Sequence, residues 1–173
     1  AAYLRQIKLP YTQAYMLAAL ARHPKTIRLL VDFFKARFGE GIPVGRKSAA
    51  ELPDSLAAAL DALESLDDDR ILRGFVNLVQ ATLRTNFFQI GSTGSPKPYL
   101  SFKFDPQSVM AMPSPRPMFE VFVYAVVMEG VHLRGGRVAR GGLRWSDRME
   151  DYRTEVLGLM KAQMVKNTVI VPV

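Results

Sequence analysis

The chain contains no cysteine and only two histidines, His23 and His132, among its 173 residues. The absence of cysteine excludes disulfide bonds and thiolate metal sites and favours a reducing compartment, so we expect a cytoplasmic protein. Two histidines do not supply a histidine-built metal site. The sequence also lacks the glycine-rich patterns with which proteins cradle the phosphates of dinucleotides and nucleoside triphosphates.

Long hydrophobic runs are missing as well. No apolar run approaches the roughly 20 residues that a membrane-spanning helix needs, and the start of the chain has no secretory pattern. We therefore expect a soluble protein without a membrane partner. With 49% apolar and 23% charged residues, the composition is that of an ordinary globular domain. The chain opens without methionine and stops inside the apolar run 168–173, so we expect it to be a piece of a longer protein.

The formal charge of +7 does not by itself choose a partner. Nucleic acid, an anionic membrane surface and an acidic small molecule all attract a basic protein. The decision between them therefore rests on particular motifs rather than on net charge.

Helical periodicity dominates residues 1–90, which we predict to be an all-helical segment. Thr12 is placed to cap a helix over 13–22, and Pro24 to open a second helix that Gly39 closes. After a loop rich in glycine and proline at 39–53, Asp54 is expected to cap a third helix, and three aspartates at 67–69 to introduce a long fourth one. The residues that recur at helical spacing in the third and fourth helices are Leu56, Leu60, Leu63, Ile71, Phe75, Leu78, Val79 and Thr82.

The period changes after the turn-forming stretch 91–98. Residues 99–104 alternate as a strand does, and the β-branched run 119–134 is expected to form one long strand or a hairpin with its bend near Glu129 and Gly130. A helix is then expected from Asp147 as N-cap, followed by a buried strand at 169–173. The sequence thus predicts an α/β fold, a mixed β-sheet with flanking helices, preceded by the helical segment.

The run HLRGGRVARGGLRWSDR, residues 132–148, carries Arg-Gly-Gly twice, at 134–136 and 140–142. Such triplets occur in disordered segments that bind single-stranded nucleic acid. An RNA-binding box of this kind has many copies in a structureless tract, whereas here two copies stand between a strand run and a helix. We therefore do not expect nucleic-acid binding.

Two interpretations of the glycine pairs remain open. In the first, they only provide turns with positive φ, and the arginines are ordinary surface residues. In the second, Arg140 and Arg144 flank Gly141 and Gly142, which keep side chains out of the way of a dianionic ligand. Lys166, at the end of the following helix, then holds the other end of that ligand. Taken alone, Lys166 is more simply explained as a cation that complements the helix dipole.

Other polar residues have simpler explanations than chemistry. Asp147 and Glu150 are spaced as a capping pair rather than as an acid and base. Ser146 has no histidine nearby in the sequence, which leaves a nucleophilic triad unsupported. His132 alternates with apolar neighbours and is expected on a strand face. The residues that we expect to pack in the core or at an interface are Met110, Met112, Met118 and Trp145.

Residues 138–173, VARGGLRWSDRMEDYRTEVLGLMKAQMVKNTVIVPV, resemble the large NAD-specific glutamate dehydrogenases of bacteria. Upstream, YLRQIKLPYTQAY, DRILRGFVNLVQATLRTNFFQ, KPYLSFKFDP and FEVFVYAVVMEGVHLRGG are also similar to that family. The motifs occur in the family's order and cover nearly the whole chain apart from about 39–66.

The resemblance implies an oxidoreductase of amino-acid catabolism that converts L-glutamate, NAD and water to 2-oxoglutarate, ammonium and NADH. It assigns residues 91–173 to part of the glutamate-binding domain, with Arg140 on the side-chain carboxylate of glutamate and Lys166 on its α-carboxylate. Arg140 stands where the family motif has lysine, which keeps the charge and changes its geometry. The remaining residues of the expected site are Gly141, Gly142, Arg144, Gln163 and Met164.

The resemblance also implies what lies beyond the chain. A lysine in a G-A-K-G-G motif, expected directly after Val173, and a Rossmann domain that binds NAD complete the chemistry, so no catalytic or NAD-binding residue is expected within residues 1–173. We expect the piece alone to be inactive and the whole protein to form a homo-oligomer. The alternative is a non-catalytic binding or assembly domain whose basic Arg-Gly-Gly loop contacts a protein or RNA.

Overall fold

The computed structural model describes residues 1–39, 51–137 and 146–166, and of residues 163–166 the backbone alone. The described chain forms two compact units. One consists of Ala1 and Pro10–Gln80, and the other of Ala2–Leu9 with the segment that begins at Ala81. The second unit is therefore assembled from both ends of the chain.

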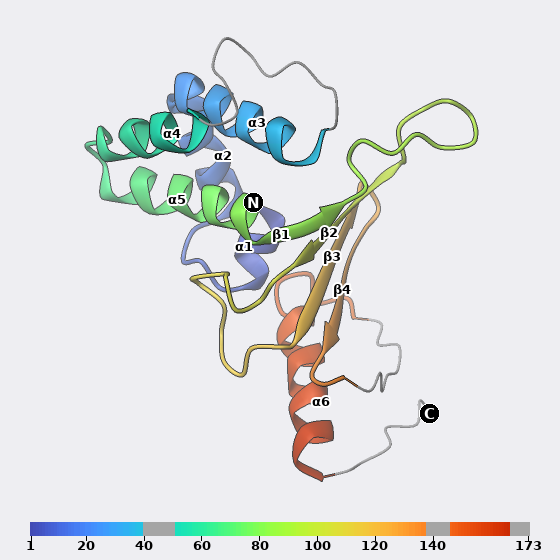
Figure 1. The fold of residues 1–173 in the computed structure, drawn as a ribbon. Helices are drawn as coiled ribbons and strands as arrows, with labels where there is room; N and C mark the ends of the chain where they lie inside the picture. The colour runs from blue at the N-terminus through green and yellow to red at the C-terminus, as the bar shows by residue number, and fades with distance from the viewer. Residues whose placement is uncertain (40–50, 138–145, 167–173) are drawn as a thin grey trace. The chain divides into compact units, whose positions relative to one another are not determined.

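The first unit is built from helices α2 (Gln13–Arg22), α3 (Pro24–Phe38), α4 (Leu52–Asp61) and α5 (Leu66–Ala81). α4 packs along α3 (Figure 1). The Thr12 hydroxyl accepts a hydrogen bond from the Tyr15 N–H and caps α2, as the sequence predicts. The start of α3 at Pro24 is also confirmed. The buried apolar side chains of these helices are Met16, Ala19, Leu52, Leu56, Leu60, Ile71, Leu72 and Val76.

Three helix limits differ from the prediction. α4 starts before Asp54, because Pro53 fits a first turn, and it ends at Asp61, so Leu63 lies beyond it. α5 stops at Ala81, where the sequence predicts a helix that continues through Thr82. Thr82 instead pairs with Phe104 on a neighbouring strand, so tertiary pairing overrides the local helical pattern.

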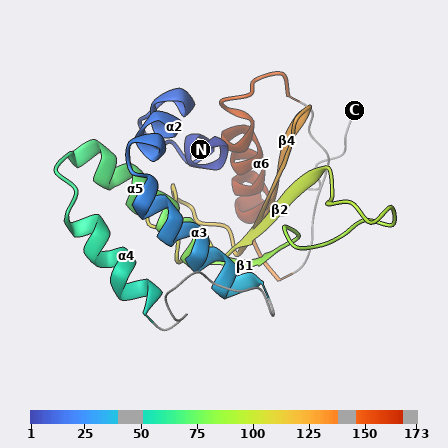
Figure 2. The same ribbon diagram turned by 90° about the horizontal axis from the view of Figure 1, so that it is seen from above.

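The described residues of the second unit form a four-stranded sheet and two helices. Its strands are β1 (Thr82–Thr85), β2 (Tyr99–Phe104), β3 (Phe119–Ala125) and β4 (Met128–Arg134), in the spatial order β1-β2-β3-β4 with every pair antiparallel. α6 (Tyr152–Lys166) packs against β4 and against the short α1 (Ala2–Gln6) (Figure 2). The Tyr3 and Phe104 rings stack with their centroids 4.5 Å apart, and this contact packs α1 against the sheet.

These elements confirm an α/β fold with helices ahead of the sheet. The four described strands are all antiparallel, and the strand predicted at 169–173 lies outside the described residues. Residues 119–134 form a hairpin whose bend is at Val126 and Val127, which corrects the bend predicted near Glu129 and Gly130. Gly130 lies within the ladder opposite Val123, where a Cβ would make only ordinary contacts, so the turn does not depend on it.

Candidate functional site

The structure describes the frame of the predicted glutamate site rather than its ligand-binding side chains. Arg140, Gly141, Gly142 and Arg144 lie outside the described residues, as does Trp145. The backbones of Gln163, Met164 and Lys166 belong to the last turns of α6, and their side chains are outside the description. The structure does describe the segments on either side of residues 138–145, which are the end of β4 before them and the start of α6 after them.

The first Arg-Gly-Gly triplet is a turn held by its own arginine. Arg134 ends β4, and its Nε donates to the carbonyl oxygen of Gly136 at 3.0 Å. Its Nη2 donates to the carbonyl oxygen of Arg137, and its guanidinium lies over the Phe119 ring at 5.7 Å. Among the described glycines a positive φ is found at Gly94 and not in this triplet, so the turn does not need the left-handed conformation that we expected.

After residues 138–145, the chain forms a turn at residues 146–151, and α6 begins only at Tyr152. The Ser146 hydroxyl accepts from the Arg148 N–H at 3.1 Å and bonds to the Glu155 carboxylate at 3.3 Å, which ties the turn to the helix. The predicted capping pair of Asp147 and Glu150 is therefore wrong.

α6 starts later than predicted because side chains of α1 and of the residues just after it bind the turn that precedes the helix. The carbonyl oxygen of Met149 accepts from Gln6 Nε2 at 2.5 Å, and that of Glu150 accepts from Lys8 Nζ at 3.3 Å. Gln6 Oε1 in turn accepts from the Arg153 N–H at 3.4 Å. Because a first-turn N–H has no partner inside its own helix, Gln6 acts as a cap that a distant part of the chain supplies.

α1 ends in a strained residue that contributes to the same contacts. Lys8 has a φ of 69°. This is the left-handed region, which costs a non-glycine residue roughly 1–3 kcal/mol. The Leu9 N–H donates to the Leu4 carbonyl at 3.0 Å, the contact that closes a helix with such a residue. From this position Lys8 Nζ donates to Asp151 Oδ1 at 2.6 Å, and this hydrogen bond, followed by the lysine charge, lowers the pKa of the Asp151 carboxyl.

A buried ion pair joins α6 to the sheet. Arg153 is 1% exposed and Glu120 of β3 is 0% exposed. Arg153 Nε contacts Glu120 Oε1, and Nη2 contacts Oε2, both at 2.7 Å. Burial disfavours the charge on Arg153, but the hydrogen bonds and charge of Glu120 outweigh it and raise the pKa of the guanidinium. Arg153 Nη2 also contacts Met112 Sδ at 2.9 Å, which confirms a packing role for this methionine.

Neighbouring groups extend this network along α1 and β4. Burial and then the nearby Glu120 charge raise the pKa of the Tyr3 phenol, which keeps it protonated. Arg5 lies 3.5 Å from the Glu129 carboxylate, which also accepts from the Tyr152 hydroxyl at 3.5 Å. Burial, followed by the Glu129 charge, raises the pKa of Tyr152. The start of α6 is therefore held on two sides, by α1 and by the β3–β4 hairpin.

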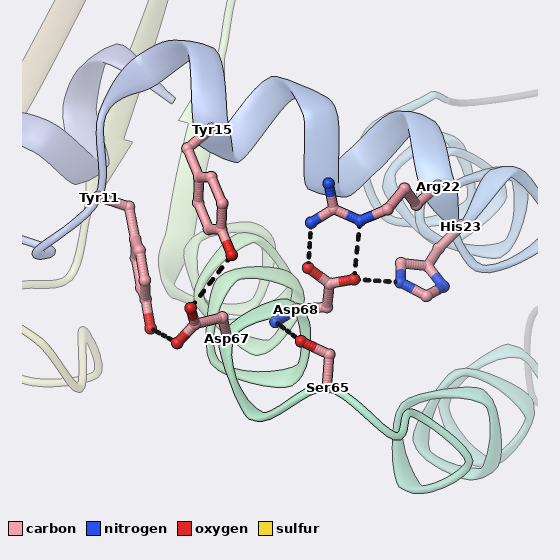
Figure 3. Close-up of polar contacts among 7 residues, drawn as sticks. All are labelled: Tyr11, Tyr15, Arg22, His23, Ser65, Asp67 and Asp68. Atoms are coloured by element: carbon pink, nitrogen blue, oxygen red, sulfur yellow. Dashed lines mark hydrogen bonds and ion pairs between the residues drawn. The ribbon is translucent and has the colours of Figure 1, made fainter.

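The helical unit holds a second polar cluster, shown in Figure 3, that serves its own packing. The Asp67 carboxylate accepts from the Tyr11 hydroxyl at 2.8 Å and from the Tyr15 hydroxyl at 3.1 Å, which ties α5 to the start of α2 (Figure 3). The carboxylates of Asp67 and Asp68 at the start of α5 thus bind different partners, since Asp68 contacts the junction between α2 and α3.

Asp68 is buried and contacts both residues of that junction. Arg22 Nε donates to Asp68 Oδ2 at 3.1 Å, Arg22 Nη2 donates to Oδ1, and His23 Nε2 lies 2.7 Å from Oδ2. The hydrogen bonds of Arg22 and then His23 lower the pKa of Asp68 to about 2. The Asp68 N–H donates to Ser65 Oγ at 3.3 Å, an N-cap whose spacing, serine followed by aspartate three residues later, is readable in the sequence.

No group of three or more histidine or acidic side chains in the described part of the chain is arranged to hold a metal ion. His132 lies exposed on β4 opposite Val121, as the sequence predicts. Met110 is 69% exposed and Met118 is 39% exposed. Among the described helices none is long and apolar enough to cross a membrane.

Comparison with known proteins agrees with the resemblance seen in the sequence. Residues 55–173 match the family described as bacterial NAD-glutamate dehydrogenase, catalytic domain, and residues 1–40 match glutamate dehydrogenase, helical motif 3. The chain is 52% identical over 181 residues to the NAD-specific glutamate dehydrogenase of Pseudomonas aeruginosa and 54% identical over 180 residues to that of Mycobacterium tuberculosis. Each alignment covers 100% of this chain and 11% of the relative.

A third relative, the NAD-specific glutamate dehydrogenase of Halomonas elongata, is 51% identical over 172 residues, again across 11% of its length. The chain thus spans about a tenth of the length of the curated relatives that it matches. The family match covers more than half of the chain. This chain belongs to the bacterial NAD-glutamate dehydrogenase family and corresponds to part of its catalytic domain together with the preceding helical motif.

Proposed function

We propose that the protein to which this chain belongs oxidatively deaminates L-glutamate, with NAD and water, to 2-oxoglutarate, ammonium and NADH. The observation that carries this proposal is the family membership of the whole chain, including the Arg140-Gly-Gly-Leu-Arg144 motif ahead of a helix that ends at Lys166. Residues 91–173 then form part of the glutamate-binding domain. The predicted all-helical segment 1–90 needs correction, because Thr82–Thr85 form strand β1 and Ala2–Leu9 belong to the unit of the sheet, which leaves the helices of Pro10–Gln80 as the separate helical unit.

In this proposal the two carboxylates of glutamate are held by two cations, one from the segment that precedes α6 in the sequence and one from the last turn of α6, which meet at the substrate. Arg140, before the helix, binds the side-chain carboxylate, while Gly141 and Gly142 allow the ligand to approach the backbone. Lys166, in the last turn, binds the α-carboxylate. Arg144, Gln163 and Met164 line the same site. Charge-assisted hydrogen bonds are among the strongest polar contacts in proteins, which suits a dianionic substrate.

We assign NAD to a part of the protein outside this chain. The described sheet is antiparallel, whereas a dinucleotide-binding unit needs parallel strands with a glycine-rich turn at a helix start. The resemblance to the family's motifs implies a catalytic lysine that is not among residues 1–173, and we propose that these residues alone are inactive. The protein is further proposed to be a cytoplasmic homo-oligomer that works in glutamate catabolism.

The test measures glutamate-dependent NAD reduction by the full-length enzyme and its Arg140→Ala and Lys166→Ala variants. Removing one charge-assisted contact costs about 1.5–3 kcal/mol, so kcat/KM for glutamate should fall roughly 10- to 150-fold in each variant. The KM for NAD should stay within about twofold, because neither residue is assigned to the cofactor.

Two exposed cations serve as matched controls. Arg137 lies shortly before the motif, and Lys161 lies on α6 before Lys166; both are exposed. Their alanine variants should retain glutamate kinetics. Unchanged kinetics in both Arg140→Ala and Lys166→Ala, or equal losses in the controls, would show that the site is assigned wrongly.

A further inference from the structure

We propose that Gln6 is a positioning residue for glutamate binding, because its side-chain amide fixes the start of α6, the helix that ends at Lys166. This inference rests on the proposed function. It assigns to α1, a helix at the far end of the sequence, a role in the substrate site. Gln6 does not touch the substrate in this proposal and acts through the helix that it holds.

The contacts of Gln6 are specific in direction. Its side chain is 1% exposed, and it donates to the Met149 carbonyl at 2.5 Å while it accepts from the Arg153 N–H at 3.4 Å. One bond therefore holds the last part of the turn before α6, and the other holds the first turn of the helix itself. An amide is the side chain that supplies both a donor and an acceptor at this position.

The length of α6 makes its starting direction important. Lys166 lies 13 residues beyond Arg153 on one continuous helix. At 1.5 Å per residue this is about 20 Å, so a tilt of about 10° at the start moves the end by roughly 3–4 Å. A displacement of about 1 Å in a binding group can already cost on the order of 100-fold in rate. Contacts at the start of α6 therefore bear directly on where Lys166 lies.

Lys8 supplies a second, independent observation. It holds a left-handed conformation with a φ of 69°, which glycine would adopt without strain. From there its ammonium bonds to the carbonyl of Glu150 and the carboxylate of Asp151, both in the turn before α6. Because Lys8 keeps this strained conformation while its side chain contacts the turn before α6, we infer that it helps to position that turn.

The two family matches place Gln6 and α6 in different parts of the chain. Gln6 falls within the match to helical motif 3, at residues 1–40, whereas α6 falls within the catalytic-domain match at 55–173. Residues 2–9 nevertheless belong to the same compact unit as the sheet and α6. The helical motif thus contributes α1 to the catalytic domain, and α1 holds its substrate helix.

The test uses the full-length enzyme with Gln6→Met, which keeps the size of the side chain and removes both hydrogen bonds. We expect the KM for glutamate to rise about tenfold and the KM for NAD to change by less than about twofold. A second variant, Lys8→Gly, removes the contacts to the turn and also relieves the left-handed strain. It should raise the KM for glutamate severalfold without lowering the temperature of thermal unfolding.

Leu4→Met is the matched control, because Leu4 is a buried residue of α1 that leaves the contacts to α6 in place. Its glutamate KM should equal that of the wild type. In an active enzyme, an unchanged glutamate KM in both Gln6→Met and Lys8→Gly would overturn the positioning role, as would equal rises in the KM for NAD. A wild-type enzyme that does not reduce NAD with glutamate would overturn the proposed function, and this inference with it.

Discussion

Replacing Arg153 with methionine should destabilise the 173-residue chain by about 3–5 kcal/mol. Arg153 and Glu120 are both almost completely excluded from water and joined by two contacts of 2.7 Å. Removing one partner leaves the other charge buried without compensation, and the typical cost is about 3–5 kcal/mol. Small domains are stable by only about 5–15 kcal/mol, so the change should be plain in equilibrium unfolding.

The double variant Glu120→Leu with Arg153→Met separates the cost of an orphaned charge from the value of the pair. Replacing a buried ion pair with apolar residues of similar volume is often neutral or stabilising. We therefore expect the free energy of unfolding of the double variant to lie within about 1 kcal/mol of that of the wild type, although that of the single variant Arg153→Met is much lower. The coupling between the two positions should then be several kcal/mol.

The assay is urea unfolding followed by far-ultraviolet circular dichroism, with the dependence on urea compared among the variants. Equal slopes are needed for the differences in midpoint to report differences in stability. The reasoning is refuted if Arg153→Met lowers the free energy of unfolding by less than about 1 kcal/mol. It is also refuted if the double variant loses as much free energy of unfolding as the sum of the losses in the two single variants.

Two further predictions concern the helical unit. Because the pKa of Asp68 is about 2 in the folded chain and near 4 in the unfolded one, its carboxylate contributes stability that is complete above about pH 4 and is lost as the pH falls toward 2. Asp68→Asn should reduce the loss of stability between about pH 4 and 2 in acid unfolding followed by circular dichroism. An acid-unfolding curve equal to that of the wild type would contradict this prediction. Thr12→Ala should lower the free energy of unfolding in urea by about 1 kcal/mol, because the Tyr15 N–H loses its cap, whereas Thr12→Ser should cost less.

Several elements were predictable because their signals are local. The threonine cap of α2, the proline at the start of α3 and the sequence pattern of the strand at 99–104 all act within a few residues, and the structure confirms each of these elements. The glutamate-site residues Arg140 and Lys166 came from a resemblance of motifs, and they remain predictions because the structure does not describe their side chains.

The elements that were predicted wrongly depend on partners far away in the sequence. Thr82 fits a helical pattern, but pairing with Phe104 makes it the first residue of a strand. Asp147 has the spacing of a cap, but contacts from Gln6 and Lys8 hold the chain in a turn until Tyr152. In both cases a local preference worth less than about 1 kcal/mol competes with tertiary contacts.

The sequence by itself determined the helix-then-sheet order and the family, since periodicity, capping residues and motif spacing are written along the chain. The tertiary structure alone decided that α1 belongs to the α/β unit and that Gln6 caps a helix 147 residues away. A buried glutamine carries no local signal of its partner, because its hydrogen bonds exist only once the chain has folded. The same holds for Glu120 and Arg153, whose opposite charges are ordinary in the sequence and become a buried pair only in the fold.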